Sequence, residues 1–357
     1  MKKYILLLAC FCSISLFGQI NTNKPVESFE KFWHFFDENY ASFEEKNIDW
    51  NFQYKKNRAF ITEKTPDTTL FRIFKSMLTD FKDDHVNLRA PSIDSFYNAG
   101  RKSLILERLG PIPGRERRAR FNEMTETTLL KEGFKKLKFI GPEYKGRALF
   151  TYTDNGKIGY LRYTRSFSSH DFMNLSLTNT LLNQIFKSFQ NLEGLVLDVR
   201  FNIGGDTSFT NNVLGRFLKE RILGNYKQQR KRGRFANKKE NYFGPRGRYQ
   251  FLDKPVAVLL NDQTVSAADE LTLVLKELPN VTLIGEPSNG SYSNMESKKL
   301  PNGWVTTLSY QRYFDAHGVN YEGLGTPVDI EVKNTLQDVE NKSDSVLNRA
   351  ILHLSKQ

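Results

Sequence analysis

The chain has 357 residues, of which 39% are hydrophobic, and a formal net charge of +12 at pH 7. This length suffices for two domains, or for one large domain with a helical extension. Beyond the N-terminus no apolar run reaches the roughly 18 residues of a membrane-spanning helix, so we expect no transmembrane segment in the mature chain. Much of the excess charge lies in residues 115–120 and 227–248, which are typical of solvated loops. Without a recognition motif, we expect no nucleic-acid partner.

Residues 1–18 have the pattern of a secretory signal peptide. Two lysines precede an apolar stretch, and cleavage is expected after Gly18 or Gln19. We therefore expect an exported protein, periplasmic or secreted. A lipid anchor through Cys10 is the alternative, because residues 7–10 resemble a lipobox, and a buried first helix is a third reading. Cys10 and Cys12 are the two cysteines of the chain, so after cleavage we expect no disulfide and no thiolate site.

Residues 19–90 are predicted to form an N-terminal helical module. Aromatic residues recur at three- and four-residue spacing over 25–43, which predicts an amphipathic helix with an aromatic core face. Two further helices are expected near 51–62 and 67–81. The module ends with the stretch 82–88, in which His85 follows two acidic residues; a lone histidine in such a place is more often structural than functional.

Residues 91–145 show little periodicity and are interpreted as a connector, to which we assign no fold. Strand and helix patterns then alternate over 146–335, the predicted core domain, and residues 336–357 form a C-terminal helix. Residues 154–156, Asp-Asn-Gly, are typical of a hairpin turn. The predicted strands of the core are 147–163 (two runs), 194–200, 255–260, 281–285, 304–310 and 328–332, and its predicted helices are 174–189, 209–218 and 271–278. The alternation favours an α/β layer fold, partly parallel, and residues 227–248 are expected to be a long surface loop.

Ser266 lies where a predicted buried strand passes into a predicted helix. Backbone N–H groups and the positive end of the helix dipole can stabilise an oxyanion at such a place, beside a serine nucleophile. The alternative is structural, because Ser266 and Asp269 also have the spacing of a capping box. Gly204 and Gly205 precede another predicted helix, and they form either an oxyanion-binding nest or a tight turn.

Other chemistries find little support in the sequence. The five histidines show no ligand spacing, so we expect no metal and no cofactor: His34, His85, His170, His317 and His353. No Gly-x-Ser-x-Gly elbow occurs, and the glycines at 204–205 do not complete a phosphate-binding loop. Glu322 lies in a loop ahead of the last predicted strand, where it could orient a base or simply be solvated.

Taken in order, these segments resemble the tricorn-core and C-terminal-processing serine peptidase family. The matching motifs are Asp84-His85, Gly159-Tyr160-Leu161, Leu197 to Gly205, Pro255 to Asn261 with Thr264 to Glu270, Ile284-Gly285-Glu286 with Gly290, Leu300 to Gly303, and Tyr321-Glu322-Gly323 with Gly325, Pro327 and Asp329. They cover about residues 26–90 and 156–332. The resemblance implies a crotonase/ClpP-like α/β core of βαβ units, and metal-free hydrolysis of peptide bonds through an acyl-enzyme.

The resemblance also implies a set of site residues. Ser266 matches the nucleophile of the family, while Ala267 and Gly204 or Gly205 match its oxyanion hole. The processing branch uses a lysine as the base, and this chain has Ser291 at that position. His85 and Glu322 instead match the histidine and glutamate of the tricorn-like branch, in which a serine stands in place of Asp84. No PDZ module is evident in this chain.

Three functions follow as hypotheses. The first is an exported serine peptidase that acts on peptides or unfolded proteins through Ser266, His85 and Glu322. The second is a catalytically inactive homologue that binds peptides or cell-envelope components, motivated by Asp84 and by the missing lysine. The third is a surface-binding protein that uses the basic residues 227–248.

Overall fold

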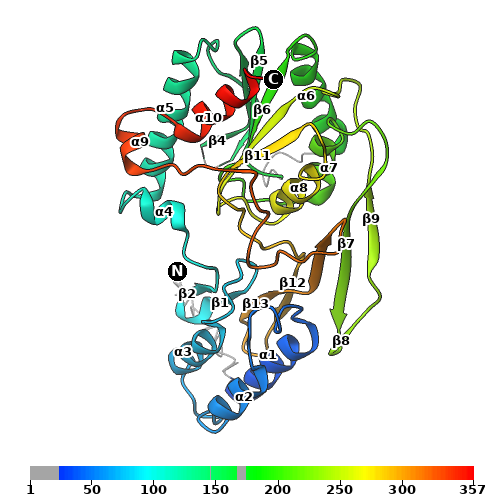
Figure 1. Ribbon diagram of the computed structural model, residues 1–357. Coiled ribbons are helices and arrows are strands. Elements are labelled where there is room, and N and C mark those ends of the chain that lie inside the picture. Colours follow the sequence, from blue (N-terminus) through cyan, green and yellow to red (C-terminus); the bar gives the residue numbers. More distant parts are fainter. Residues whose placement is uncertain (1–23, 145, 167–173) are drawn as a thin grey trace, which may run out of the picture.

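The computed structural model describes residues 24–144, 146–166 and 174–357. The predicted signal peptide, both cysteines and His170 lie outside these ranges. The described chain forms an upper lobe around a large sheet and a lower lobe that contains the first three helices (Figure 1). Between 24 and 357, with the two gaps noted, no helix has the length and apolarity to cross a membrane.

The upper lobe is organised by a seven-stranded sheet in the order β15-β11-β10-β6-β5-β4-β3. Its strands are β3 (Lys138–Tyr144), β4 (Arg147–Asp154), β5 (Ile158–Tyr163), β6 (Gly194–Asp198), β10 (Val256–Leu260), β11 (Val281–Gly285) and β15 (Ile330–Glu331). The strands from β5 to β15 pair in parallel, whereas β3, β4 and β5 pair antiparallel. The predicted hairpin and the predicted buried strands are therefore confirmed.

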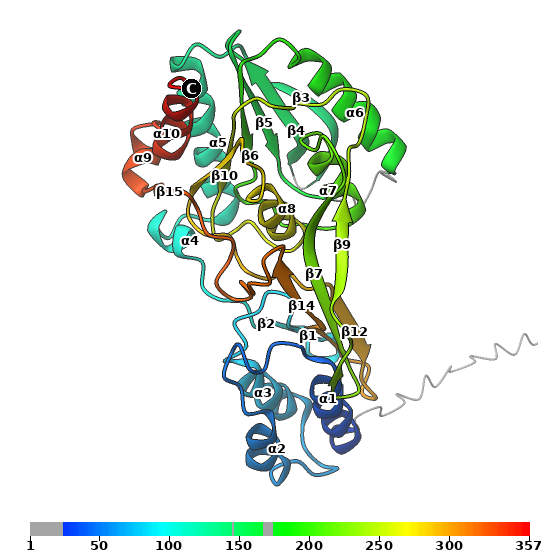
Figure 2. The same cartoon turned by 45° about the vertical axis from the view of Figure 1, so that its right-hand side comes forward.

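Helices cover both faces of this sheet (Figure 2). On one face lie α6 (Leu175–Ser188), α7 (Thr207–Leu214) and α8 (Ala267–Leu275), and on the other lie α5 (Gly114–Lys131) and α10 (Ser345–Leu354). Alternate residues of one strand serve the two layers: Leu195 and Leu197 belong to the first core and Val196 to the second. Two short helices, α4 (Leu104–Arg108) and α9 (Leu336–Glu340), complete the upper lobe. The predicted mixed α/β class is confirmed.

The lower lobe combines three helices with a four-stranded antiparallel sheet in the order β12-β13-β1-β2. Its elements are α1 (Pro25–Asn39), α2 (Trp50–Arg58), α3 (Asp67–Leu78), β1 (Asn87–Ala90), η1 (Pro91–Ile93), β2 (Ser95–Asn98), β12 (Met295–Lys299) and β13 (Val305–Ser309). The predicted aromatic faces meet here, with the rings of Phe32 and Phe74 stacked at 4.1 Å. Trp304 packs edge-on against Phe74, so a distant part of the sequence completes this core.

The predicted surface loop at 227–248 is wrong, because most of it is a sheet. The strands β7 (Ile222–Lys231), β8 (Arg234–Phe235), β9 (Lys239–Phe243) and β14 (Gln311–Asp315) form an arm that runs from the upper lobe to the lower one (Figures 1 and 2). Basic side chains lie over aromatic rings of the arm, as Arg312 does over Phe235 at 4.1 Å. The stems of these long basic side chains cover the rings while their charged ends stay in water. The strands therefore contain many basic residues, and the alternation of apolar and polar residues that predicts a strand is not visible in the sequence.

The arm is fastened to α1 by two hydrogen bonds. Gly233 N–H donates to the carbonyl of Glu38 at 2.9 Å, and the Arg230 guanidinium donates to the carbonyl of Asp37 at 2.9 Å.

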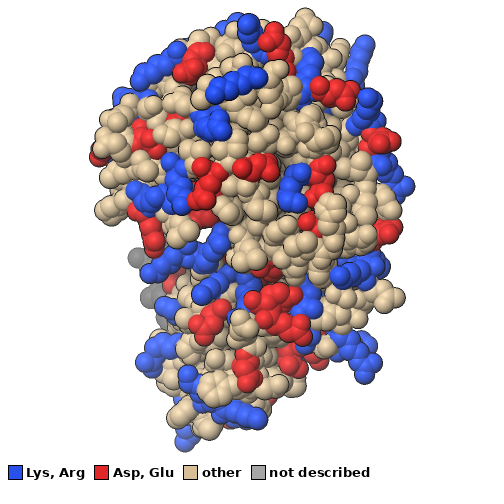
Figure 3. Space-filling model, in the orientation of Figure 1, with Lys and Arg blue, Asp and Glu red and all other residues tan. Residues whose placement is uncertain are grey.

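The face of the molecule seen in Figure 3 carries interspersed basic and acidic side chains, so the positive net charge forms no single basic patch there.

Candidate active site

The loops that carry the candidate residues meet at one edge of the large sheet. β6 and β10 are parallel neighbours, so the segments that follow them leave the sheet on the same side. Val265 N–H donates to the carbonyl of Asn202 at 2.9 Å. A methyl group added to Gly204 would lie 2.8 Å from Ser266 Cβ. The predicted glycine loop and the predicted nucleophile are therefore in direct contact.

Ser266 has an unusual backbone conformation for a helix cap. Its φ is 62° and its ψ is −120°, whereas φ of the N-cap residues whose side chains accept a helix N–H lies between −122° and −77° across the described chain. A non-glycine residue held there costs about 1–3 kcal/mol, and such residues cluster at functional sites. The predicted capping box is present as well, since Ser266 N–H donates to Asp269 Oδ2 at 2.6 Å.

The amides that face Ser266 differ in their availability. Gly204 N–H donates to Asn202 Oδ1 at 2.9 Å, so this donor is already engaged. Gly204 is needed for its small size, because a Cβ would lie 2.5 Å from the carbonyl oxygen of Val265, and its φ of +72° also favours glycine. Within the described residues, the amides of Gly205 and Ala267 have no hydrogen-bond acceptor. These two donors are free to bind an oxyanion.

His85 lies in the loop between α3 and β1 and is 9% exposed. Its N–H donates to Asp83 Oδ1 at 2.9 Å, and its ring Nδ1 is 3.4 Å from Ser309 Oγ. Burial lowers the pKa of His85 below its ordinary value, against the opposing negative charge of Asp83. The neutral ring is therefore favoured near neutral pH, which is the form that a general base needs.

Asn289 connects the His85 loop with the Ser266 loop. Its backbone N–H donates to the carbonyl of Thr264 at 2.8 Å and its side-chain amide donates to the carbonyl of Asp262 at 3.1 Å, while its side chain also lowers the pKa of Asp84 in the His85 loop. Burial raises the pKa of Asp84, although the Asn289 hydrogen bond opposes the shift. No hydrogen bond in the described structure joins the His85 ring to the Ser266 hydroxyl. The two loops are thus held together through Asn289.

Glu322 is buried next to Lys46, a residue that the sequence did not single out. Glu322 Oε1 is 3.8 Å from Lys46 Nζ, and Tyr292 N–H donates to Oε2 at 3.4 Å. Burial raises the pKa of Glu322 well above its ordinary value, although Lys46 lowers it. Glu322 and His85 share Lys46 and Asp83 as charged neighbours. Nothing in the sequence around Lys46 signals this pairing, since it joins segments 276 positions apart.

A second buried carboxylate, Asp269, links the Ser266 helix with the same region. It accepts the N–H groups of Ser266, Gly290 and Ser291, at 2.6, 2.9 and 3.2 Å. Burial raises the pKa of Asp269 to about 7. The hydroxyl of Ser291, at the position of the family's lysine, donates to Asn289 Oδ1 at 2.6 Å. The base of the processing branch therefore has no counterpart at this position.

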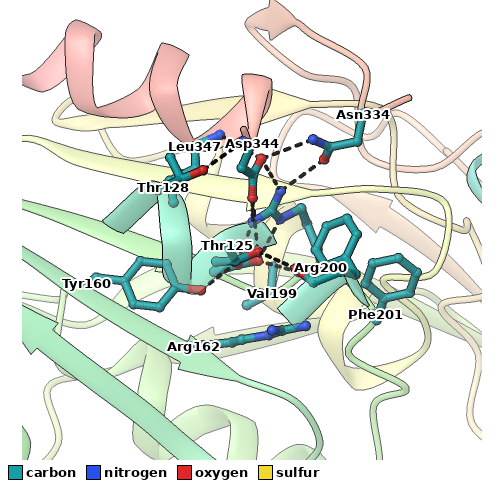
Figure 4. Close-up of polar contacts among 12 residues, drawn as sticks. Thr125, Thr128, Tyr160, Arg162, Val199, Arg200, Phe201, Asn334, Asp344 and Leu347 are labelled. Carbon is teal, nitrogen blue, oxygen red and sulfur yellow. Dashed lines mark hydrogen bonds and ion pairs between the residues drawn. The ribbon is translucent and has the colours of Figure 1, made fainter. Parts of the chain in front are cut away.

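A buried ion network surrounds Arg200, which precedes the glycine loop in the sequence (Figure 4). The Arg200 guanidinium donates to Asp344 Oδ1 and Oδ2 at 2.9 Å each, and to Asp198 Oδ1 and Oδ2 at 3.0 and 2.7 Å. Arg200 also donates to Asn334 Oδ1 at 3.0 Å. Asp344 is the N-cap of α10, so the network ties the C-terminal helix to the segment that leads into Gly204.

Comparison with known proteins shows which family this architecture resembles. The model of peptidase family S41 matches residues 157–332. The carboxy-terminal-processing protease of Bartonella bacilliformis is 28% identical over 202 residues, which are 56% of this chain and 44% of that protein. The chain thus spans less than half the length of this curated relative.

Solved structures agree in fold. A candidate peptidase from Parabacteroides merdae is 28% identical and has a TM-score of 0.73, with 92% of this chain and 96% of that chain covered. Mature CPAF is 12% identical and has a TM-score of 0.63, with coverage of 94% and 96%, which is a likeness of fold alone.

The matched residues include Ser266, the glycine loop and Glu322, whereas His85 precedes them. The predicted resemblance to the C-terminal-processing peptidases is confirmed for this part of the chain. Residues 157–332 are a peptidase S41 domain, of the serine-peptidase type.

Proposed function

We propose that this chain is an exported serine peptidase that hydrolyses peptide bonds through an acyl-enzyme on Ser266. One observation carries the proposal: the strained backbone of Ser266 lies against a glycine loop, and the amides of Gly205 and Ala267 beside it are unengaged. The positive φ distinguishes Ser266 from the N-cap residues of the described chain whose side chains accept a helix N–H and so stabilise the helix.

In the proposed reaction, Ser266 Oγ attacks the carbonyl carbon of the scissile bond while His85 takes the hydroxyl proton. The carbonyl oxygen becomes an oxyanion that accepts hydrogen bonds from Gly205 and Ala267. The C–N bond breaks as His85 returns the proton to the leaving amine, and the acyl group stays on Ser266. Water, deprotonated by His85, then releases the acid and restores the hydroxyl.

The His85 ring has to reach the Ser266 hydroxyl for this reaction. Catalytic hydrogen bonds are often long before substrate binds and tighten in the complex. Asn289 already joins the two loops, and Glu322 with its partner Lys46 borders the His85 side of the site. A carboxylate there would stabilise the imidazolium that forms when the ring takes the proton.

The test compares the mature chain with three variants on a denatured, fluorescently labelled protein substrate. Ser266→Ala and His85→Ala are expected to lose activity by a factor of about a thousand or more. His317→Ala is the matched control, because His317 is an exposed histidine that pairs with Glu277 at 2.8 Å. Equal hydrolysis by the wild type and Ser266→Ala would refute the proposal.

Export is a separate part of the proposal and rests on the pattern of residues 1–18. N-terminal sequencing of protein recovered from outside the cytoplasm should give a chain that begins near residue 19. A chain that begins at a lipid-modified Cys10 would instead support the lipid anchor, and an intact Met1 would contradict export.

A catalytically inactive, peptide-binding homologue is the second candidate function. Asp84 stands where the tricorn-like branch has a serine, and the His85 ring contacts Ser309 rather than Ser266. Labelling of the wild type by a serine-directed phosphonate, with no labelling of Ser266→Ala, would exclude this alternative. Peptide binding without labelling or turnover would favour it.

A further inference from the structure

Lys46 is a buried lysine that joins two segments of the candidate site. Its side chain is 6% exposed, and its Nζ lies 3.8 Å from Oε1 of Glu322, whose side chain is wholly buried. The same Nζ donates to the carbonyl of Lys82 at 3.2 Å, three residues before His85. A single ammonium group therefore connects the loop that carries His85 with the loop that carries Glu322.

The backbone is constrained on both sides of this contact. Lys82 has a φ of +47°, a left-handed conformation that is uncommon for a residue other than glycine. Gly323, which follows Glu322, has a φ of +75°, and a Cβ there would lie 3.2 Å from Lys46 Nζ. Lys46 thus contacts both loops at points where the backbone adopts conformations that cluster at functional sites.

The loop that carries Lys46 is itself fixed to the arm. Arg312, on β14, pairs with Glu44 at 2.7 Å and with Glu45 at 2.6 Å. Within the loop, Lys46 N–H donates to the carbonyl of Ser42 at 3.2 Å. These contacts restrict the positions that the ammonium group can reach, so its place between the two site loops is built into the fold.

Ionisable groups from several elements surround this contact. Asp83 and Asp84 act on the charge of His85 from its own loop, and Lys46 acts on it from the loop after α1. The groups that interact electrostatically with Glu322 are Lys46, Asp83, Asp269, Tyr40, Tyr292 and Tyr313. Lys46 is the cation that acts on both residues.

The positive charge of Lys46 favours the reactive form of each residue. Burial raises the pKa of Glu322 well above its ordinary value, and Lys46 opposes that shift, which favours the carboxylate. Burial lowers the pKa of His85, and Lys46 adds to this effect against Asp83 and Asp84, which favours the neutral ring. A neutral base and a charged carboxylate are the forms that the proposed reaction needs at its start.

We propose that Lys46 is a positioning residue for catalysis, whose ammonium group holds the Glu322 carboxylate beside the His85 loop. It acts through Glu322 and His85 and not on the substrate. The inference rests on the proposed peptidase function, because it assigns a role within that same site. The alternative is an ion pair that only joins two parts of the fold, and such a pair would not affect the pH dependence of the reaction.

The first measurement is the pH profile of kcat and KM for cleavage of a labelled, denatured protein. Lys46→Met keeps the apolar stem and removes the charge, so kcat at pH 7 should fall roughly tenfold to a hundredfold with little change in KM. The acidic midpoint of kcat/KM should move to higher pH, because the charge that lowers the pKa of His85 is gone. Lys46→Arg keeps the charge and should restore the wild-type midpoint.

The second measurement does not depend on turnover. Chains labelled with ¹³C at histidine Cε1 are titrated by NMR, and the His85 signal is identified by its absence in His85→Ala. The pKa of His85 should be higher in Lys46→Met than in the wild type, and Lys46→Arg should reverse the change. Lys135→Met is the matched control, because Lys135 pairs with Asp154 at 2.6 Å, at the end of the sheet where the parallel strands begin, opposite the site.

A cycle of variants tests whether Lys46 acts through Glu322. Lys46→Met should reduce kcat much less in a Glu322→Gln background than in the wild type, because the carboxylate that it holds is absent. This background also leaves no Glu322 carboxylate buried without its cation, so it serves if Lys46→Met alone does not fold. There, too, the pKa of His85 should rise when Lys46 is replaced. Circular dichroism verifies that each variant is folded.

An unchanged midpoint, an unchanged pKa of His85, additive losses in the cycle, or changes equal to those of Lys135→Met would each overturn the role of Lys46. The peptidase proposal fails separately. A wild type that cleaves no substrate, but in which the pKa of His85 still depends on Lys46, would refute the proposed function and leave the charge contact established. Cleavage that is independent of Lys46 would refute only the positioning role.

Discussion

Replacement of Arg200 by methionine tests how much the buried guanidinium, which lies between two carboxylates, contributes to the free energy of unfolding. Arg200 and its partners Asp198 and Asp344 are almost wholly buried, and five hydrogen bonds of 2.7–3.0 Å bind the guanidinium to these carboxylates and to Asn334. Methionine keeps much of the apolar stem but leaves two carboxylates without their cation. Breaking a buried pair costs about 3–5 kcal/mol, and we expect the upper end because two anions are stranded.

The pH dependence of the loss identifies its cause. In the wild type, burial alone would raise the pKa of Asp344, but Arg200 holds it below its ordinary value. Its contribution to stability is therefore present above the unfolded pKa of about 3.9 and is lost as the pH falls through the lower folded pKa. In Arg200→Met the burial of Asp344 is no longer opposed by the guanidinium, so the pKa of Asp344 should rise above its unfolded value and the stability of the variant should decrease as the pH rises.

Urea unfolding followed by circular dichroism at pH 5 and pH 7 measures both effects. The difference between wild type and Arg200→Met should be smaller at pH 5 than at pH 7. Lys342→Met is the control, since Lys342 pairs with Glu123 at half-exposed positions near the same helix, and such a pair contributes about 0–1 kcal/mol. A loss for Arg200→Met that matches the control, or that is the same at both pH values, would refute the reasoning.

Three further outcomes are expected. Gly204→Ala should reduce peptidase activity at least tenfold, because its Cβ meets backbone atoms at 2.5 and 2.8 Å, whereas Gly303→Ala, with similar φ and open space, should leave activity unchanged. Burial lowers the pKa of His85, and activity falls as the pH drops through that pKa, so the acidic midpoint of the kcat/KM profile should lie below pH 6.5. A midpoint above pH 6.5 would contradict the role of His85 as the base. Trp304→Ala should destabilise the chain by about 3–5 kcal/mol in urea unfolding, since it removes a buried ring that packs on Phe74, and a loss under 1 kcal/mol would contradict that packing.

The parts of the fold that the sequence predicts well are those with strong local patterns. The run at 255–260 is a buried parallel strand because both of its faces meet a helical layer, so it is apolar throughout. Ser266 lies a short loop beyond this strand and before the apolar periodicity of α8, so its place at the start of that helix was predictable. The aromatic spacing of residues 25–43 similarly predicts α1, although this helix ends at Asn39.

The features that the sequence conceals depend on contacts between distant segments. Helix α5 has only a few apolar residues among its arginines, so its periodicity is weak, yet it lines a pocket and packs near α10. The arm at 222–243 has a polar sequence because long basic side chains, rather than apolar ones, cover its aromatic rings. Lys46 and Ser309, which border Glu322 and His85, become neighbours of these residues only through contacts between segments far apart in the sequence.

The backbone of Ser266 has a consequence for how this chain can evolve. Glycine would occupy that conformation with less steric penalty, so Ser266→Gly should make the protein harder to unfold while it removes the hydroxyl. A lineage that no longer needed the hydroxyl would gain stability by losing it. If Ser266 is the proposed nucleophile, the chain keeps its hydroxyl at a cost in stability.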